Sequence, residues 1–382
     1  MRKILFVSNL ATRVGSFSLS SVEAAQRLGF EFHIAANWNG VAPELIAEDE
    51  RKYGVKTHHI DLARSPFSWS NRAAYKQLVK IVRDEKIDFI HCNTPVGGLL
   101  GRLAGNKCKV KKILYQVHGF HFCKGAPALN WALYYPVEKW LARRTDALVA
   151  INKEDYELAR KKFKLRGGGA VYYVPGVGVD ASGYGPDEAV RKAKRAELGL
   201  GENDVALLST GELSERKNNR VVIEAMAKLK RPNLYYFICG VGDLRESLQR
   251  LADDAGIGDK TRFLGYRTDV KELLQAADCF LLPSYREGLS RSLMEAMASG
   301  TPCVASKIRG NVDLLEGENG GFLCAPNDAD AFAEKLALLA DDAELRATMG
   351  RNNLTNVRKF DFETATREMR KVYEAAFGGS DA

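Results

Sequence analysis

Residues 279–300 read CFLLPSYREGLSRSLMEAMASG, and this stretch holds one complete strand–loop–helix repeat. Its first four residues are continuously apolar, which is typical of a parallel strand that is covered on both faces. A loop follows over 284–289, and Ser290 is placed to cap a helix whose apolar face begins at Leu293 and Met294. A buried strand that passes through a short loop into an amphipathic helix is the repeating element of an α/β fold.

The same alternation runs through the whole chain. Strands are expected at 3–8, 30–36, 57–60, 87–92, 112–118, 147–151 and 171–174, and then at 205–209, 234–239, 262–264, 279–283, 302–305 and 321–324. Turn residues dominate 174–187, so we place a hinge there. The sequence therefore predicts an α/β protein with two Rossmann-like doubly wound domains, 1–180 and 181–360, that face each other across a cleft. The segment 361–382 is expected to be a helix that crosses back to the first domain.

Length and composition agree with this organisation. The chain has 382 residues, of which 46% are hydrophobic and 27% charged, and it contains no apolar run long enough to span a membrane. Its seven cysteines are odd in number, form no C-x-x-C pair and fall mostly in apolar strands. That usage is typical of a reducing compartment, so a cytoplasmic location is expected.

The net charge of +8 is distributed unevenly. Residues 1–180 contain 28 basic (Lys+Arg) and 16 acidic (Asp+Glu) residues, whereas residues 181–382 contain 28 basic and 32 acidic ones. The excess is concentrated in residues 101–170, which contain 15 basic and 5 acidic residues. This asymmetry indicates an anionic partner for the first half: nucleic acid, a membrane surface or a phosphorylated substrate. A solvated basic face without a partner would give the same counts.

Two carboxylates, Glu287 and Glu295, flank the start of the helix in the opening stretch. Free backbone N–H groups at a helix start bind phosphate oxygens, and the two carboxylates can accept hydrogen bonds from sugar hydroxyls. Taken alone, the pair is described equally well as one exposed loop acid and one helix-surface acid.

The surroundings of this pair resemble the family 4 glycosyltransferases, which are retaining enzymes of the GT-B fold that use sugar nucleotides. The segments that carry the resemblance are the E-x7-E match at 287–295, GYRTDV (265–270), RGNVDL (309–314) and GENGGFL (317–323). In the first half, HCNTPVGG (91–98), HGFHFCKGAP (118–127) and VPGVGVD (174–180) resemble a branch that acts in capsular or exopolysaccharide assembly. The resemblance covers nearly the whole chain.

The resemblance implies roles for individual residues. Glu295 would accept hydrogen bonds from the ribose, and Glu287 would face the hydroxyls of the donor sugar. Lys217 matches the family's diphosphate-binding lysine, and His118 matches the histidine that reaches the donor sugar or its phosphate. The catalytic set would therefore be His118, Lys217 and Glu287, and the further donor-binding residues would be Gly15, Gly211, Arg216, Tyr266, Arg267, Gly288, Leu289 and Ser290. Without the resemblance, Lys217 would be a solvated residue that opens a helix, and His118 would be as well explained as a structural strand-end histidine.

The sequence departs from the family pattern at two positions. Glu212 stands where the family usually has an arginine, and a carboxylate cannot bind a diphosphate. We expect Arg216 to supply the missing charge, with Arg291 as the second choice. The family's Gly-Gly pair in the first loop is represented only by Gly15, and we assign Gly15 and Ser16 to contact with the donor or the acceptor.

The resemblance implies a retaining transfer of a hexose or an N-acetylhexosamine. The donor would be a UDP-sugar, with a GDP-sugar as the alternative, held by the second domain. The acceptor would be lipid diphosphate-linked or a glycan, held by the first domain. No cofactor and no metal are expected, and no Asp-x-Asp pair follows a strand. A sugar-nucleotide epimerase of related two-domain fold is the alternative function, and nucleic-acid binding is not expected because no recognition module is present.

The segment 129–144 mixes aromatic and leucine side chains with basic ones. This mixture suits a surface that lies against an anionic membrane, so we expect peripheral contact with the inner face of the plasma membrane. A segment of buried core would show the same apolar residues, and Pro136 interrupts the helical pattern.

Overall fold

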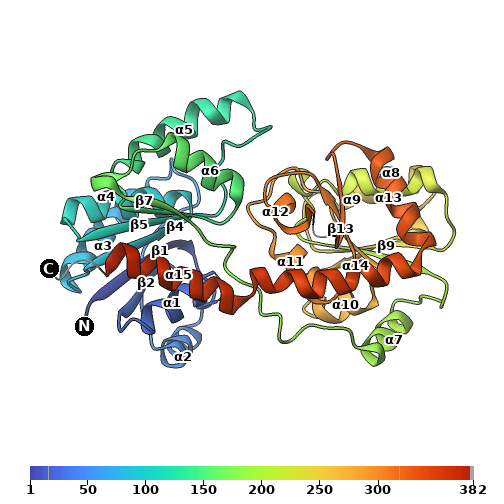
Figure 1. The fold of residues 1–382 in the computed structure, drawn as a ribbon, viewed down its shortest axis with the longest axis horizontal. Coiled ribbons are helices and arrows are strands. Elements are labelled where there is room, and N and C mark those ends of the chain that lie inside the picture. Colours follow the sequence, from blue (N-terminus) through green and yellow to red (C-terminus); the bar gives the residue numbers. More distant parts are fainter. Residues whose placement is uncertain (16, 318, 379–382) are drawn as a thin grey trace. The chain divides into compact units, whose positions relative to one another are not determined.

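The computed structural model describes residues 1–15, 17–317 and 319–378. Its contacts divide the chain into two compact units. Unit 1 is Met1–Gly178 together with Phe362–Ala382, and unit 2 is Val179–Asp361 (Figure 1). The first crossing between the units therefore falls inside the turn-rich stretch 174–187, and the second falls just before the last helix.

Unit 1 is built on a seven-stranded parallel sheet with the order β3-β2-β1-β4-β5-β6-β7. Its strands are β1 (Lys3–Leu10), β2 (Glu31–Asn37), β3 (Lys56–His59), β4 (Phe89–Asn93), β5 (Lys112–Val117), β6 (Ala147–Ala150) and β7 (Ala170–Tyr173). Its helices are α1 (Leu19–Gln26), α2 (Pro43–Tyr53), α3 (Ser70–Asp84), α4 (Pro95–Cys108), α5 (Ala128–Ala142), α6 (Lys153–Lys162), the short 3₁₀ turn η1 (Arg166–Gly168) and α15 (Phe362–Phe377).

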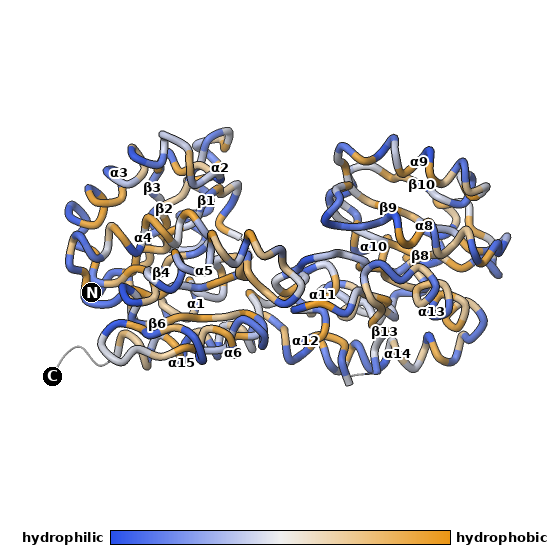
Figure 2. The backbone as a smooth tube through the Cα atoms, turned by 90° about the horizontal axis from the view of Figure 1, so that it is seen from above, coloured by the Kyte–Doolittle hydropathy of each residue, from blue (hydrophilic) through white to orange (hydrophobic). Residues whose placement is uncertain are grey.

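Both faces of this sheet are covered, which explains why its inner strands β1, β4, β5 and β6 are mainly apolar, whereas the edge strand β3 is polar. Along β1, Leu5 and Val7 join a cluster with α3 and α4, whereas Ile4 and Phe6 join a second cluster with α1 and α15. Alternate side chains of one strand therefore enter cores on opposite faces. Figure 2 shows the apolar strands in orange between helices of mixed polarity.

The final helix completes the core of unit 1. Tyr373 and Phe377 are fully buried, and the Phe377 ring stacks on Phe89 of β4 with 4.5 Å between centroids. The Tyr373 hydroxyl lies 2.7 Å from Nδ1 of the buried His91. Unit 1 is thus assembled from the two ends of the chain.

Unit 2 is built on a six-stranded parallel sheet with the order β10-β9-β8-β11-β12-β13. Its strands are β8 (Val205–Thr210), β9 (Leu234–Cys239), β10 (Thr261–Gly265), β11 (Cys279–Leu282), β12 (Cys303–Ser306) and β13 (Gly321–Cys324). Its helices are α7 (Glu188–Glu197), α8 (Asn219–Leu229), α9 (Arg245–Asp254), α10 (Val270–Ala276), α11 (Arg291–Ala298), α12 (Asn311–Leu315), α13 (Ala329–Asp341) and α14 (Ala343–Asn356), with 3₁₀ turns η2 (Glu215–Lys217), η3 (Gly258–Lys260) and η4 (Val357–Phe360).

Each sheet reverses its strand order once, between β1 and β4 in unit 1 and between β8 and β11 in unit 2. In doubly wound sheets, ligands bind beyond the carboxyl ends of the strands at this switch point. The predicted fold class, two Rossmann-like parallel sheets in one α/β chain, is confirmed. No helix among the described residues combines the length and the apolar character needed to cross a bilayer.

Candidate active site

Two loops meet at the switch point of unit 2. One follows β8 and ends in η2, and the other follows β11 and leads into α11. Tyr285 N donates to Arg216 O at 2.9 Å, and Asn218 Nδ2 donates to Pro283 O at 3.1 Å. These bonds fix the backbones of the two loops against each other.

The side chains of the two loops form a compact charged cluster. Lys217 Nζ lies 2.8 Å from Glu287 Oε1, and Arg216 Nη1 lies 3.2 Å from the same oxygen. The side chains of Lys217 and Glu287 are only 13% and 12% exposed. The fold thus brings together three of the residues that the sequence assigned to the donor, and it leaves one carboxylate shared between two cations.

A glycine makes room for this lysine. Gly211 follows β8 with φ +138°, and a Cβ at that position would lie 3.0 Å from Lys217 Cε. Lys217 itself belongs to the η2 turn, and α8 begins two residues later at Asn219. The alternative description of Lys217, a solvated residue that opens the helix, does not hold, because its side chain is only 13% exposed and it precedes the helix.

The loop that carries Glu287 is braced from β12 and α12. Arg309 Nε donates to Glu287 O at 3.2 Å. Gly310 has φ +81°, and a Cβ there would lie 2.2 Å from Gly288 O, so only glycine fits this approach. Sequence reasoning assigned no role to Arg309 or Gly310, although both lie in the RGNVDL segment that carried the resemblance.

The start of α11 agrees with the predicted cap. Ser290 is buried, and its Oγ accepts a hydrogen bond from Leu293 N at 3.4 Å. Glu295 lies on this helix, and its Oε1 is 2.8 Å from Arg291 Nε. Arg291, the second choice for the diphosphate, is thus engaged by Glu295, while Leu289 packs partly buried on the core.

Tyr266 and Arg267 follow β10, at the edge of the same sheet. Tyr266 is 78% exposed. Arg267 lies between two carboxylates, with Nε 2.6 Å from Asp269 Oδ1 and Nη2 2.8 Å from Glu197 Oε1. Its hydrogen bonds hold the pKa of Asp269 well below the usual range. Contact of this pair with the donor stays a prediction.

Glu212, at the position where the resemblance led us to expect an arginine, is exposed and forms no ion pair within the described part of the chain. Arg216 supplies a second cation beside Lys217. That Arg216 takes over the role of the arginine missing at position 212 stays a prediction.

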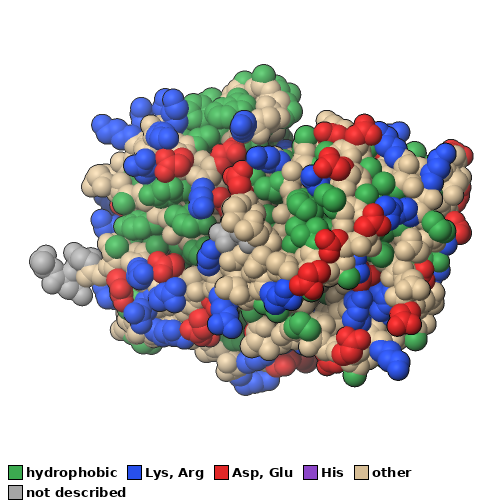
Figure 3. Space-filling view, turned by 45° about the vertical axis from the view of Figure 1, so that its right-hand side comes forward, with side chains coloured by type: hydrophobic (Ala, Val, Ile, Leu, Met, Phe, Trp, Pro, Cys, Tyr) green, Lys and Arg blue, Asp and Glu red, His purple; other side chains and the backbone are tan. Residues whose placement is uncertain are grey.

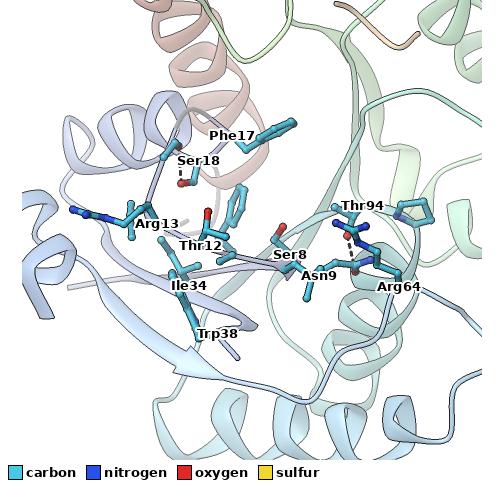
Figure 4. A pocket seen from close by; sticks show the side chains of 16 residues that line it. Ser8, Asn9, Thr12, Arg13, Phe17, Ser18, Ile34, Trp38, Arg64 and Thr94 are labelled. Carbon is cyan, nitrogen blue, oxygen red and sulfur yellow. Dashed lines mark hydrogen bonds between the residues drawn. The ribbon is translucent and has the colours of Figure 1, made fainter. Parts of the chain in front are cut away.

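Unit 1 has a pocket of about 450 Å³ at the carboxyl end of β1 (Figure 4). It is lined by Phe6, residues 8–15, Phe17, Ser18, Ile34, Trp38, Arg64, Thr94 and Pro95. Arg13 anchors the lining loop, because its Nε donates to Asp49 Oδ1 at 2.9 Å and Asp49 Oδ2 accepts from Val14 N at 2.7 Å. Gly15 lies on this wall, and Ser16 falls outside the described residues.

A strained residue marks the switch point of unit 1. Thr94 has φ +64° and ψ 158°, a conformation that is costly for a β-branched side chain. Its Oγ1 donates to Asn9 Oδ1 at 2.9 Å, and the same oxygen accepts from Gly97 N at 3.0 Å. Strain of this kind is concentrated at binding sites and persists only where neighbouring contacts enforce it.

His118 follows β5 and is held by its neighbour strand. Its Nε2 lies 2.8 Å from Asn93 Oδ1, and its ring centroid is 5.4 Å from that of Phe17, which lines the pocket. Burial lowers the pKa of His118 to about 4, so the imidazole is neutral at neutral pH. Because a carboxamide oxygen accepts, Nε2 carries the proton in this arrangement.

Sequence reasoning missed Asn9, Asn93 and Thr94. The signal that could have found them is a polar residue at or just after the carboxyl end of a buried strand beside a switch point. Within the described residues, no group of three or more His, Cys, Asp or Glu side chains is arranged to hold a metal ion.

Residues 190–355 match the family described as glycosyl transferases group 1, and residues 3–152 match the one described as glycosyl transferase 4-like. This chain is 36% identical over 379 residues to EpsD of Bacillus subtilis (strain 168), a protein named as a glycosyltransferase. The match covers 98% of this chain and 97% of EpsD. The chain belongs to the family 4 glycosyltransferases. This resolves the alternative between a glycosyltransferase and an epimerase.

Further comparisons place the glycosyltransferase more closely. It is 28% identical over 341 residues to an Escherichia coli protein named UDP-Gal:alpha-D-GlcNAc-diphosphoundecaprenol alpha-1,3-galactosyltransferase, across 88% of this chain and 87% of that protein. Together with EpsD, this relative supports the predicted exopolysaccharide and capsule branch of the family.

Solved structures confirm the GT-B fold of the glycosyltransferase. Anabaena HepE in complex with UDP superposes with a TM-score of 0.79 at 20% identity, across 98% of this chain and all of that one. Sucrose-phosphate synthase from Thermosynechococcus elongatus superposes with a TM-score of 0.83 at 20% identity over the full length of both chains.

Proposed function

We propose that this glycosyltransferase moves a hexose or an N-acetylhexosamine from a UDP-sugar to a lipid diphosphate-linked or glycan acceptor, with retention at the anomeric carbon. The observation that carries the proposal is the 2.8 Å contact between Lys217 Nζ and Glu287 Oε1 at the switch point of unit 2. The substrates are supported by the E. coli relative, whose name states a UDP-Gal donor and a diphosphoundecaprenol-linked acceptor, and by HepE complexes with UDP and UDP-glucose.

In this proposal unit 2 binds the sugar nucleotide. Glu295 accepts from the ribose hydroxyls, Glu287 accepts from the sugar hydroxyls, and the backbone of 288–290 approaches the diphosphate. In the free protein Glu287 pairs with both Lys217 and Arg216, so the three side chains together keep one net positive charge. An arriving diphosphate competes for these cations, which leaves the Glu287 oxygens free to orient the sugar.

The proposed reaction forms a bond between the acceptor oxygen and the anomeric carbon while the bond from that carbon to the diphosphate breaks. The electron pair of the broken bond goes to the diphosphate, and a diphosphate oxygen takes the proton of the acceptor hydroxyl. Lys217 and Arg216 stabilise the negative charge on the leaving diphosphate, so the proposal includes no metal ion. His118, neutral because of its low pKa of about 4, serves as a hydrogen-bond partner of the donor sugar or its phosphate.

Unit 1 is the proposed acceptor side, with Gly15 and its pocket in contact with donor or acceptor. The proposed setting is the cytoplasmic face of the plasma membrane, in bacterial capsule or exopolysaccharide synthesis. A lipid diphosphate acceptor would agree with the positive charge of residues 101–170.

A panel of sugar nucleotides tests the donor. UDP-hexoses, UDP-N-acetylhexosamines and GDP-hexoses are offered to the purified protein, with and without a lipid diphosphate-linked sugar and with EDTA present. We expect UDP release to rise with acceptor and to persist in EDTA, and NMR of the product to show retention. Release from GDP-sugars alone, an inverted product or a loss of transfer in EDTA would each overturn the matching part of the proposal.

Matched variants test the site. Glu287→Ala and Lys217→Ala are expected to abolish transfer while the protein stays folded by circular dichroism. Glu224→Ala and Lys228→Ala change the same residue types on the exposed side of α8 and serve as controls. Full turnover by either site variant would remove that residue from the mechanism.

A further inference from the structure

Helix α5 of unit 1 turns large apolar side chains toward solvent. The exposed fractions are 65% for Leu129, 36% for Trp131, 55% for Leu133, 38% for Tyr134, 45% for Val137 and 44% for Trp140. Within the helix only Leu141 and Ala142 are buried. Figure 3 shows hydrophobic side chains gathered at the top of unit 1, where Figure 1 places α5, with lysine or arginine side chains beside them.

A buried ion pair decides which face of α5 looks outward. Arg102 of α4 has no exposed surface, and its guanidinium donates to both carboxylate oxygens of Glu138, at 2.9 and 3.2 Å. The same guanidinium lies 3.9 Å from the centroid of the Tyr115 ring. Glu138 therefore anchors the inner side of α5. Leu129, Leu133 and Trp140 lie on the opposite side of the helix and face solvent, whereas Trp131 contacts Phe122 and Tyr134 contacts His121.

The same helix and its flanks carry positive charge without compensation. Residues 124–144 contain Lys124, Lys139, Arg143 and Arg144, and their one carboxylate is Glu138, which faces inward. None of these four cations pairs with a carboxylate in the part of the chain that the structure describes. The Arg144 guanidinium lies 3.8 Å from the centroid of the Trp140 ring, so a cation and an exposed indole stand together at the end of the helix.

We propose that α5 is the docking surface of this protein for an anionic lipid bilayer. Leucine and tryptophan side chains beside lysine and arginine are the residues of helices that lie in the membrane interface. Charge complementarity selects this occupant, because anionic lipid head groups attract the four cations. In a second copy of the chain, the same face would bring like charges together instead. The proposal is independent of the donor chemistry of unit 2.

Vesicle sedimentation of the full chain tests the exposed leucines of α5. The protein is expected to bind phosphatidylglycerol-containing vesicles and to bind phosphatidylcholine vesicles far less. The variant Leu129→Gln with Leu133→Gln is expected to lose binding by at least about tenfold, since each leucine loses most of its burial energy. Leu45→Gln on α2, a leucine that is 39% exposed, is the control and should bind as the parent does.

Charge reversals test the electrostatic part. Lys139→Glu with Arg143→Glu is expected to weaken binding to anionic vesicles at low salt by about fivefold or more for each site. Lys76→Glu with Arg83→Glu makes the same charge change on exposed positions of α3 and should have a small effect. Binding of the parent must also weaken as salt rises. Salt-independent binding, or equal loss in the α3 control, would overturn the proposal.

Tryptophan quenching locates the contact. Brominated anionic lipids are expected to quench Trp140, so Trp140→Phe should lose part of the quenching. Trp69→Phe is the matched control, because Trp69 is also exposed and also has an arginine, Arg72, 4.0 Å from its ring centroid. If Trp69→Phe loses part of the quenching and Trp140→Phe does not, the assignment to α5 is contradicted. Sedimentation velocity tests the other occupant. If the protein is a dimer and the Leu129 and Leu133 substitutions dissociate it, a second copy covers this face and the proposal is overturned.

Discussion

Single glycines set the geometry of the candidate site more strictly than its charged residues do. Gly310 combines a φ of +81° with a Cβ position only 2.2 Å from Gly288 O. A methyl group there cannot be accommodated by a side-chain rotation, because the atom it meets is backbone. The loop with Glu287 must then shift, even though residue 310 touches no predicted ligand.

We therefore predict that Gly310→Ala raises the KM for the sugar nucleotide by about tenfold or more, because misplaced donor contacts cost affinity. The control is Gly256→Ala, where φ is +72° and no atom lies within 4 Å of the added Cβ. Gly256→Ala carries backbone strain without the clash, so it should lower stability by about 1 kcal/mol and leave the KM unchanged. Equal KM values in the two variants would contradict the bracing role of residue 310.

A buried histidine makes the stability of unit 1 sensitive to acid. Burial lowers the pKa of His91 from 6.5 to about 3. As pH falls, the unfolded chain therefore binds a proton first, so the stability from this histidine is complete above about pH 6.5 and is lost toward pH 3. We predict that in His91→Gln the unfolding free energy falls less steeply with decreasing pH than in the parent protein. The slope should differ by up to about 1.4 kcal/mol per pH unit between pH 6.5 and pH 3, measured by urea titration at several pH values. His59→Gln, at a side chain that is 41% exposed, is the control, and an unchanged slope in His91→Gln would refute the effect.

The contacts of individual residues were the least predictable from sequence. Lys217 and Glu287 were found through the resemblance, because an isolated lysine or glutamate carries no signal of its own. The bonds from Asn93 to His118 and from Arg309 to the Glu287 carbonyl join segments that are 25 and 22 residues apart. Only the strand order brings such segments together, so a reading along the chain could not find them.

At the scale of elements, a buried ion pair between Arg102 and Glu138 anchors helix α5 to α4. Glu138→Gln would leave the fully buried Arg102 guanidinium without its counter-charge, which typically costs about 3–5 kcal/mol. We predict that this single change strongly destabilises unit 1 in urea unfolding. The double variant Arg102→Met with Glu138→Met should recover most of the loss, because an apolar pair needs no counter-charge. A double variant as unstable as Glu138→Gln would show that the helix needs the ion pair itself.

Elements were predicted well where both faces of a strand are covered, and less well at helix ends. Strand β4 was expected at 87–92 and occupies Phe89–Asn93, since its apolar run is continuous. The apolar periodicity of α3 starts only at Ala73, whereas the helix begins at Ser70, because its first turn, Ser-Asn-Arg, is polar. Pro136 was expected to interrupt the helical pattern, yet α5 continues through it.

Segment 129–144 shows what the sequence left open. Composition alone described a membrane surface and a buried core equally well. The structure separates its residues: Leu141 is buried and Tyr135 packs partly buried against the core, while Leu129, Leu133 and Trp140 face solvent. The direction of each side chain depends on how α5 is anchored to α4, which no periodicity in α5 reveals.

At the scale of the whole molecule, the chain offers two switch points of the same topology and different chemistry. Unit 2 presents Lys217, Arg216 and Glu287, whereas unit 1 presents a pocket with Asn9 and Thr94. We predict that UDP slows hydrogen exchange most strongly in 211–217 and 284–295, because the cations lie there. At a UDP concentration of about 100 times Kd, the unfolding free energy of unit 2 should rise by about 2.7 kcal/mol. If UDP slows hydrogen exchange only in residues 8–18, the nucleotide binds to unit 1 instead.

The return of α15 to unit 1 has a consequence for the newly made protein. Most of unit 1 is translated before unit 2, yet the helix that covers Phe89 and bonds His91 is translated only after unit 2. Unit 2 can therefore close its sheet before unit 1 is complete. Until α15 is translated, Phe89 and the apolar residues around it lack the helix that covers them, so we expect chaperones to bind the nascent N-terminal half and stop codons before residue 362 to destabilise it.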